Sequence, residues 1–206
     1  MAPFNLSATL NALRILKSPT LLYPQLTIPT FDYLPVPLSP ALKGDIRAVI
    51  LDKDNCFTVP YAKEVYPAYK DAFERLRKEY GDRLLIVSNS AGTDDDVGHI
   101  EAEVLEKNTG VKVLRHSTKK PGCYPDIMSY LASKTDVKRA DQVAIVGDRL
   151  FTDVLMANMM GSWAVWVNTG VVDPKRTLHG RVERGLLGVV KWGGGKAPVP
   201  TGDVWR

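Results

Sequence analysis

From residue 46 onward, short apolar runs alternate with segments whose apolar residues recur at helical spacing. The apolar runs have the length and composition of strands that are buried on both faces of a sheet: 48–51, 84–87, 111–114, 143–146 and 163–167. The spacing between them predicts helices over 69–80, from 93 onward, over 124–133 and over 152–160. Strands alternating with helices predict an α/β fold with a doubly wound parallel sheet, because the crossovers between parallel strands are right-handed.

The first 40 residues follow a different pattern. They contain seven of the 14 prolines, so we expect neither a long helix nor a central strand after Pro19. Ahead of that proline, residues 5–18 place leucines on one stripe and predict a short amphipathic helix. Such a helix either lies on a membrane surface or covers part of its own domain. The sequence therefore predicts three parts: an N-terminal arm over 1–40, an α/β core over 41–180, and a basic helix and tail over 181–206.

Composition and charge exclude several classes of protein. With 206 residues, of which 45% are hydrophobic and 24% charged, the chain can bury a core, which excludes general disorder or a fibre. Cys56 and Cys123 are too few and too far apart for a disulfide scaffold or a CxxC site, so we expect free thiols in a reducing compartment. No run approaches the roughly 20 apolar residues that span a bilayer. The net charge of +4 is compatible with an anionic partner.

Polar side chains gather just after four of the predicted strands. In an open parallel sheet, ligands bind beyond the carboxyl ends of the strands, so these side chains are expected to meet at one edge. Each fragment alone is commonplace, since acid pairs lie on surfaces and serines cap helices. Their occurrence in this order is not explained by folding alone. The four sets are Asp52, Lys53 and Asp54; Ser88 and Asn89; Lys120; and Asp148, Arg149 and Asp153.

These groups suit phosphoryl transfer. Asp52, directly at a strand end, is the candidate nucleophile, because a carboxylate can attack phosphorus and form an aspartyl-phosphate. Asp54 is placed to give a proton to the leaving alkoxide and later to take one from water. Attack on a phosphate dianion needs a divalent cation, and Mg²⁺ prefers oxygen ligands. We expect Mg²⁺ to be held by the carboxylates of Asp52 and Asp148 and by the backbone carbonyl of Asp54.

The remaining candidates have supporting roles. Ser88 can donate a hydrogen bond to the transferring phosphoryl group, and Lys120 can pair with its charge and hold the nucleophile. Asp153 is expected to brace the metal site or Lys120 from behind. Arg149 and Lys53 either contact substrate phosphate or balance local charge. We include Asn89 with them as a candidate substrate contact.

The order of these motifs resembles the haloacid dehalogenase superfamily, subclass IIIA. The resemblance implies a Rossmann-like core in which Asp52 is the nucleophile and Asp54 the acid/base. In having an aspartate at position 54, the chain resembles the phosphatases of that superfamily. Four longer stretches are similar to the mitochondrial phosphatidylglycerophosphate phosphatases of fungi and their plant and bacterial relatives: 51–56, 87–92, 116–122 and 147–153.

This second resemblance covers residues 40–180. It implies hydrolysis of phosphatidylglycerophosphate to phosphatidylglycerol on the route to cardiolipin. It also implies a peripheral position at the matrix side of the inner mitochondrial membrane.

The space between the motifs bears on the substrate. Many members of the superfamily carry a cap domain, but the spans 58–84 and 90–119 are too short for one, so we expect an open site. An open site admits a phosphate on a large body, and the apolar arm and basic tail favour a membrane with anionic lipids. We expect no nucleic-acid partner, and an extended arm can wrap a neighbouring subunit in a homo-oligomer. The alternatives are a soluble phosphatase for a protein, nucleic-acid or sugar phosphate, and a binding module without turnover.

Overall fold

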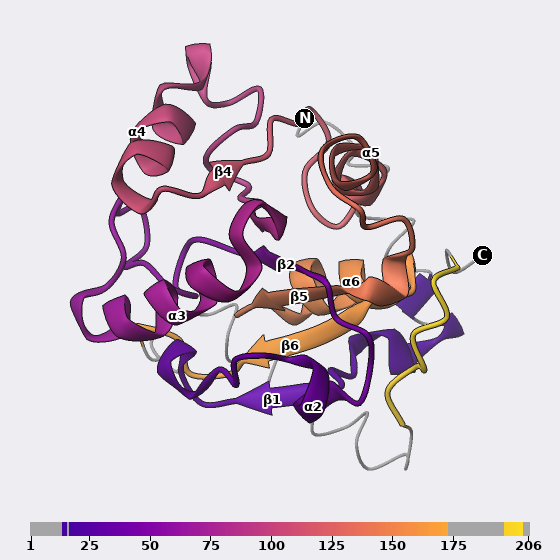
Figure 1. The fold of residues 1–206 in the computed structure, drawn as a ribbon. Helices are drawn as coiled ribbons and strands as arrows, with labels where there is room; N and C mark the ends of the chain where they lie inside the picture. The colour runs from indigo at the N-terminus through magenta and orange to yellow at the C-terminus, as the bar shows by residue number, and fades with distance from the viewer. Residues whose placement is uncertain (1–13, 16, 173–195, 204–206) are drawn as a thin grey trace.

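One six-stranded parallel sheet forms the centre of the molecule, as Figure 1 shows. The computed structural model describes residues 14–15, 17–172 and 196–203. In sheet order the strands are β1 (Leu26–Ile28), β6 (Trp163–Val167), β5 (Val143–Gly147), β2 (Ala48–Leu51), β3 (Leu84–Ile86) and β4 (Lys112–Val113). The helices are α2 (Ser39–Leu42), α3 (Lys70–Tyr80), α4 (Ile100–Thr109), α5 (Tyr124–Lys134) and α6 (Leu155–Met160). The α/β fold that the sequence predicts is confirmed.

The sheet is covered on both faces. Successive side chains of a strand point to opposite sides, so β2 contributes Val49 and Leu51 to one apolar cluster and Ala48 and Ile50 to the other. The first cluster includes the apolar faces of α3 and α4, and the second includes those of α5 and α6. Because both faces are buried, the strands read as nearly continuous apolar runs.

One helix begins later than the sequence predicts. A helix was expected from Thr93, but α4 begins only at Ile100. His99, directly before it, has a φ of 58°, in the left-handed region that a right-handed helix does not contain. The acidic segment still acts on this helix, because the Asp96 carboxylate accepts hydrogen bonds from the backbone N–H of Glu101 and of the next residue. Negative charge favours a helix N-terminus, as expected, but it acts here from a preceding loop.

Within the described residues, the segment from residue 17 to residue 40 is part of the α/β domain and does not form a separate arm. β1 pairs with β6 at the edge of the sheet, which is where prolines on either side of a strand are tolerated. Further along, Phe31 and Leu38 are fully buried in the core. Gln25 ties the segment to the body, since its Oε1 accepts the backbone N–H of Ala164 at 2.6 Å. The predicted boundary at residue 40 therefore does not separate two structural units.

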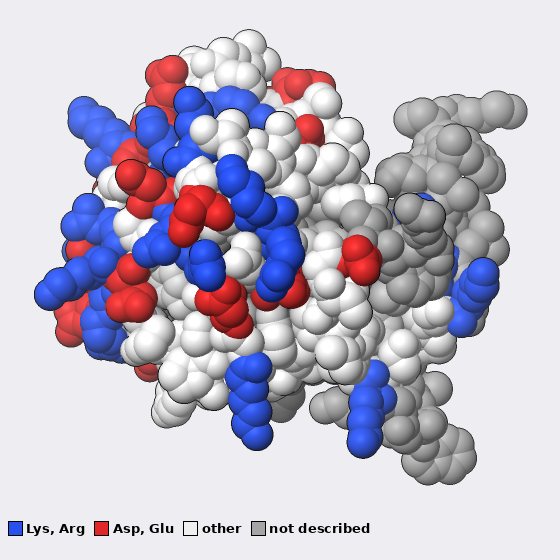
Figure 2. Space-filling view, turned by 45° about the vertical axis from the view of Figure 1, so that its right-hand side comes forward, with Lys and Arg blue, Asp and Glu red and all other residues white. Residues whose placement is uncertain are grey.

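Two predicted helices lie mostly or wholly outside the described residues. The amphipathic helix predicted over 5–18 is described only at residues 14, 15, 17 and 18, and there Ile15 packs against the core. The predicted C-terminal helix lies outside the described part of the tail, 196–203, which has no regular structure and contacts the domain where Gln25 donates to the Pro198 carbonyl at 2.7 Å. No helix in the described ranges combines the length and the apolar character that crossing a bilayer requires. Figure 2 shows acidic and basic side chains intermixed on the face in view, so the positive net charge is not gathered there in one patch.

Candidate active site

The predicted nucleophile lies at the carboxyl end of β2. Asp52 follows this strand directly, and its backbone N–H donates to the Val146 carbonyl of β5 at 2.9 Å, which continues the sheet ladder past the strand. Its side chain is buried, and its Oδ1 accepts a hydrogen bond from Lys120 Nζ at 2.5 Å. The ladder fixes the backbone and the lysine fixes the carboxylate, so Asp52 has one defined orientation.

Lys120 is held from three directions. Its Nζ also donates to Asp153 Oδ1 at 2.6 Å, and its backbone N–H donates to Asn89 Oδ1 at 2.9 Å. The ammonium is thus shared between two buried carboxylates, and the loop that carries it is tied to the loop after β3. Asn89, predicted to contact substrate, has a side chain that positions the lysine loop.

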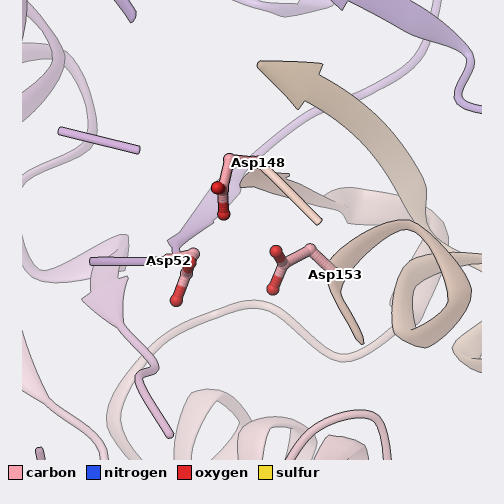
Figure 3. Close-up of side chains that lie close together, drawn as sticks. All are labelled: Asp52, Asp148 and Asp153. Atoms are coloured by element: carbon pink, nitrogen blue, oxygen red, sulfur yellow. The ribbon is translucent and has the colours of Figure 1, made fainter. Parts of the chain in front are cut away.

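Three carboxylates converge at this edge, as Figure 3 shows. The nearest oxygens of Asp52, Asp148 and Asp153 all lie within 4.8 Å of one another. Asp153 is already engaged, since its second oxygen accepts the Arg149 backbone N–H at 3.1 Å. Asp148 Oδ2 accepts from Asn55 Nδ2 at 2.9 Å, whereas its Oδ1 is buried without a hydrogen-bond partner.

A divalent cation fits this donor set. Mg²⁺ prefers oxygen ligands, and an unpartnered buried oxygen such as Asp148 Oδ1 is costly unless a cation or a donor meets it. Asp52 and Asp148 are therefore the side chains that could hold the ion. Asp153 braces Lys120 from behind, which is one of the two roles that the sequence predicts for it.

Burial and mutual repulsion shift the ionisation of this cluster. Burial raises the pKa of Asp52 to about 6, although the nearby Lys120 opposes the shift. Burial also raises the pKa of Asp148 well above its ordinary value, and the charges of Asp52 and Asp153 add to the effect. Burial alone would lower the pKa of Lys120, but Asp153 and Asp52 together raise it above its usual range. The positive charge of Lys120 therefore favours the ionised forms of these carboxylates, against the effect of burial.

The predicted acid/base lies beside this cluster and has three donors of its own. Asp54 Oδ1 accepts from Lys53 Nζ at 2.6 Å and from the Tyr61 backbone N–H at 2.7 Å, and its Oδ2 accepts from Ser90 Oγ at 2.6 Å. Lys53 is buried, and its Nζ also donates to the Ala62 carbonyl at 3.2 Å. Lys53, predicted as a substrate contact or a counter-charge, thus acts as the counter-charge of Asp54.

Ser88 is fully buried, and its Oγ lies 3.0 Å from Ser90 Oγ. His116 connects the serine loop to the lysine loop, because its Nε2 lies 3.1 Å from the Ser88 carbonyl and its Nδ1 lies 2.8 Å from the Thr118 carbonyl. The sequence motifs predict no role for Asn55, Ser90 or His116. Each of these residues lies within a few positions of a predicted motif. Its hydrogen-bond partner, however, either is far away in the sequence or is brought close by the conformation of a loop.

A pocket of about 230 Å³ opens above these groups. Arg149 is exposed at this pocket, as a contact for a substrate phosphate requires, whereas Lys53 does not line it. The two spans where a cap domain would be inserted are described throughout, and they hold only α3 in the first and α4 with β4 in the second, apart from short turns. The residues that line the pocket come from all four motif loops and from the turn after β2: Asp52, Asp54, Pro60, Tyr61, Asn89, Ser90, Lys120, Arg149 and Thr152.

Comparison with known proteins identifies the family. The family model described as mitochondrial PGP phosphatase matches residues 6–172. The mitochondrial phosphatidylglycerophosphatase of Saccharomyces cerevisiae is 49% identical over 168 residues, which cover 81% of this chain and 89% of that protein. The probable mitochondrial phosphatidylglycerophosphatase of Schizosaccharomyces pombe is 36% identical over 165 residues, covering 76% of this chain and 78% of that protein.

Among solved structures, an uncharacterized protein from Listeria monocytogenes serotype 4b superposes with a TM-score of 0.44 and 18% sequence identity, over 71% of this chain and 99% of that one. The family model covers residues 6–172, a range that includes every motif at the carboxyl edge of the sheet, and the two yeast relatives each match most of the chain. The chain therefore belongs to the mitochondrial PGP phosphatase family.

Proposed function

We propose that this protein is a Mg²⁺-dependent phosphatidylglycerophosphatase of the haloacid dehalogenase superfamily, subclass IIIA, that acts through an aspartyl-phosphate. The names of its relatives support the substrate. The observation that carries the mechanism is the position of Asp52, which lies on the floor of an open pocket with Lys120 at 2.5 Å and Asp54 nearby. A carboxylate held by a buried lysine beside an acid/base is suited to covalent phosphoryl transfer.

In the first step, a carboxylate oxygen of Asp52 bonds to phosphorus and the bond from phosphorus to the glycerol oxygen breaks. Asp54 gives its proton to the leaving alkoxide, so the products are the alcohol and a phosphorylated Asp52. In the second step, Asp54 takes a proton from water, whose oxygen bonds to phosphorus while the bond to Asp52 breaks.

Lys120 keeps Asp52 aligned in the first step, and Arg149 is assigned to the phosphoryl oxygens. Ser88, fully buried and outside the pocket lining, holds Ser90 through its hydroxyl. Bound at Asp52 and Asp148, Mg²⁺ supplies positive charge that offsets the repulsion between the nucleophile and the phosphate.

The product, phosphatidylglycerol, would enter the route to cardiolipin. We place the enzyme at the matrix side of the inner mitochondrial membrane as a peripheral protein that meets an anionic lipid surface. Two observations support this placement: the relatives are named as mitochondrial proteins, and the pocket is open to a phosphate that remains in a bilayer. An open pocket does not require the lipid to leave the membrane.

The direct test measures phosphate release from vesicles that contain phosphatidylglycerophosphate. Release should require Mg²⁺, stop in EDTA and return when Mg²⁺ is restored, and Asp52→Asn should abolish it while circular dichroism shows an intact fold. Trapping a beryllofluoride adduct on wild-type protein, but not on Asp52→Asn, tests the covalent step. Activity that persists without divalent metal would refute the mechanism.

The substrate is tested by direct comparison of phosphatidylglycerophosphate, phosphatidic acid and soluble phosphate esters. We expect the highest kcat/KM with phosphatidylglycerophosphate. A soluble sugar, peptide or nucleotide phosphate that is hydrolysed more efficiently would favour the alternative of a soluble phosphatase. Binding of phosphate and metal without any turnover would favour a binding module.

A further inference from the structure

The most exposed apolar side chains of the described residues are concentrated at one edge of the molecule. Six large apolar side chains are exposed, and four of them lie on the segments that follow β2 and β3, the last at the start of α4: Val59, Tyr61, Val97 and Ile100. The remaining two, Tyr33 and Val199, lie elsewhere in the sequence. Because the strands are parallel, both loops emerge at the carboxyl edge of the sheet, where the active site lies.

Direct contacts hold these two loops together. Lys63 Nζ lies 2.7 Å from Glu101 Oε1, and Asn108 Nδ2 donates to the Lys63 carbonyl at 3.0 Å. Lys63 is two residues after Tyr61, and Glu101 directly follows Ile100. These contacts hold together the two segments that carry the four exposed apolar side chains, which we call the apolar rim and define as Val59, Tyr61, Val97 and Ile100.

Tyr61 connects the apolar rim to the catalytic pocket. It lines the pocket, its backbone N–H donates to Asp54, and its side chain is 83% exposed. Its φ of 67° lies in the left-handed region, which is uncommon for a bulky residue and is seen at sites where the surrounding structure imposes it. Packing within the protein does not account for an exposed aromatic ring held in this way. A tyrosine has an apolar body and a polar tip, and therefore suits the boundary between water and a membrane.

We propose that the apolar rim is the surface with which this protein contacts the lipid bilayer, and this inference rests on the proposed function. The reason is geometric. A phosphate that stays attached to a lipid reaches Asp52 at the pocket floor only when the mouth of the pocket lies against the bilayer. The exposed side chains at that edge of the sheet then meet the membrane first. They include Tyr61 at the pocket itself and the other apolar side chains of the segments that follow β2 and β3.

The charges near the apolar rim are compatible with an anionic surface. Asp95 is paired with Lys119, and Glu101 is paired with Lys63, so two of the acids in these loops have a basic partner. Arg149, exposed at the same pocket, forms no ion pair with any residue that the structure describes, and its guanidinium is available to a lipid phosphate. Apolar insertion supplies the attachment, and this arginine faces the head groups.

The first experiment reads out membrane contact without relying on activity. Both native cysteines are buried, so a cysteine introduced by Val97→Cys can be labelled selectively with the environment-sensitive dye NBD. We expect a blue shift and a rise of emission when vesicles of phosphatidylcholine and phosphatidylglycerol are added. Tyr33→Cys, labelled in the same way, is the matched control and should change little. An equal response at both positions, or a response at Tyr33→Cys alone, would overturn the proposal.

The same label tests a second occupant of the surface. If the NBD emission of Val97→Cys shifts with rising protein concentration in the absence of vesicles, the apolar rim is covered by another copy of the chain. That result would also overturn the proposal. Phosphate release from phosphatidylglycerophosphate vesicles is measured on the labelled proteins in parallel, so a wrong surface on a working lipid phosphatase is distinguished from a wrong function.

The second experiment compares two serine variants. Val59→Ser/Val97→Ser/Ile100→Ser should raise KM for phosphatidylglycerophosphate in vesicles about tenfold or more and reduce co-flotation with them, which follows from lost apolar burial. Its kcat/KM for a soluble phosphate ester should remain unchanged. The control Tyr33→Ser/Val199→Ser removes two equally exposed apolar side chains and should behave as wild type in both assays. Equal vesicle activity of both variants would refute the proposal.

Discussion

Lys120 Nζ lies 2.5 Å from Asp52 Oδ1, and the two residues are 68 positions apart in the sequence. Both side chains are almost fully buried, so water screens their attraction very little. Asp153 is the second partner of the lysine and lies 2.6 Å from it. One ammonium therefore holds together the loops that follow β2, β4 and β5, in addition to orienting the nucleophile.

Removing this lysine should affect stability as well as catalysis. Lys120→Met leaves two buried carboxylates without a cation, and breaking a buried pair in this way costs about 3–5 kcal/mol. Lost alignment of Asp52 should lower kcat by about 10²–10³-fold. The checks are urea unfolding and phosphate release. Lys119→Met is the matched control, because its partner Asp95 is exposed, and it should stay near wild type. Equal unfolding midpoints for the two variants would contradict this role of Lys120.

Asn55 should control the affinity for Mg²⁺ through Asp148. Its Nδ2 donates to Asp148 Oδ2 at 2.9 Å, so Asn55→Ala removes the only hydrogen bond found for that carboxylate among the described residues. Loss of such a partner typically weakens metal binding about 10–100-fold. We expect the Mg²⁺ concentration for half-maximal activity to rise by that factor, with kcat recovering at saturating Mg²⁺. Asn108→Ala, at a remote exposed amide, should leave this concentration unchanged, and the same rise in both variants would exclude the proposed link.

Ser90 should matter according to how difficult the leaving group is. Its hydroxyl donates to Asp54 Oδ2, while Lys53 and the Tyr61 backbone hold the other oxygen. General acid catalysis contributes about 10²–10⁴-fold, so Asp54→Asn should lose about that much with an alkyl phosphate, and Ser90→Ala should lose less. Both losses should shrink with p-nitrophenyl phosphate, whose leaving group departs without a proton. A Ser90→Ala defect of the same size with both substrates would indicate a general structural effect. Ser117→Ala, at an exposed serine, is the control.

Asp96 should make the fold sensitive to acid. Burial alone would raise its pKa, but backbone N–H donors from Gly92, Glu101 and Ala102 reverse this and lower the pKa below the ordinary value. A lowered pKa means that the unfolded chain binds protons more readily, so this group stabilises the fold above a pH of about 3.9. The contribution is lost as the pH falls through the folded-state pKa.

Thermal unfolding between pH 7 and pH 2 tests this prediction. Asp96→Asn should be less stable than wild type by about 1–3 kcal/mol at pH 7, since the amide accepts the backbone donors less well. The difference should shrink toward pH 2, where the wild-type carboxyl is also neutral. Asp94→Asn, at an exposed neighbour, should follow the wild-type curve throughout. A constant gap between Asp96→Asn and wild type at every pH would show that charge is not involved.

Local pattern was sufficient for most of the sheet. The runs at 48–51 and 163–167 match β2 and β6 in both bounds, because a strand buried on two faces must be apolar at every position. The local pattern was insufficient for the start of α4. Residues 93–96 form turns and bends, and Gly98 and His99 both have positive φ, so the helix begins only after them.

The two lysines nearest the nucleophile show where the sequence stops being informative. Lys53 is adjacent to Asp52 in the sequence, yet its Nζ donates to Asp54 Oδ1 and to the Ala62 carbonyl. Lys120, far along the chain, is the residue that reaches Asp52. The position of Lys120 soon after a predicted strand was enough to place it at the same edge as Asp52, whereas adjacency to Asp52 left the role of Lys53 open between two alternatives.

The sequence was sufficient to predict which chemical groups meet at the carboxyl edge of the sheet, because each follows an apolar run and the ends of parallel strands lie at one edge. The tertiary structure was needed to show that residues 26–28 complete the sheet, that Asn55 and Ser90 hold the two aspartates, and that the exposed Tyr61 lines the pocket. The two kinds of property depend on residues at different separations in the sequence. Periodicity is a property of neighbouring residues, whereas a hydrogen bond or an exposed surface depends on distances between segments that the sequence keeps far apart.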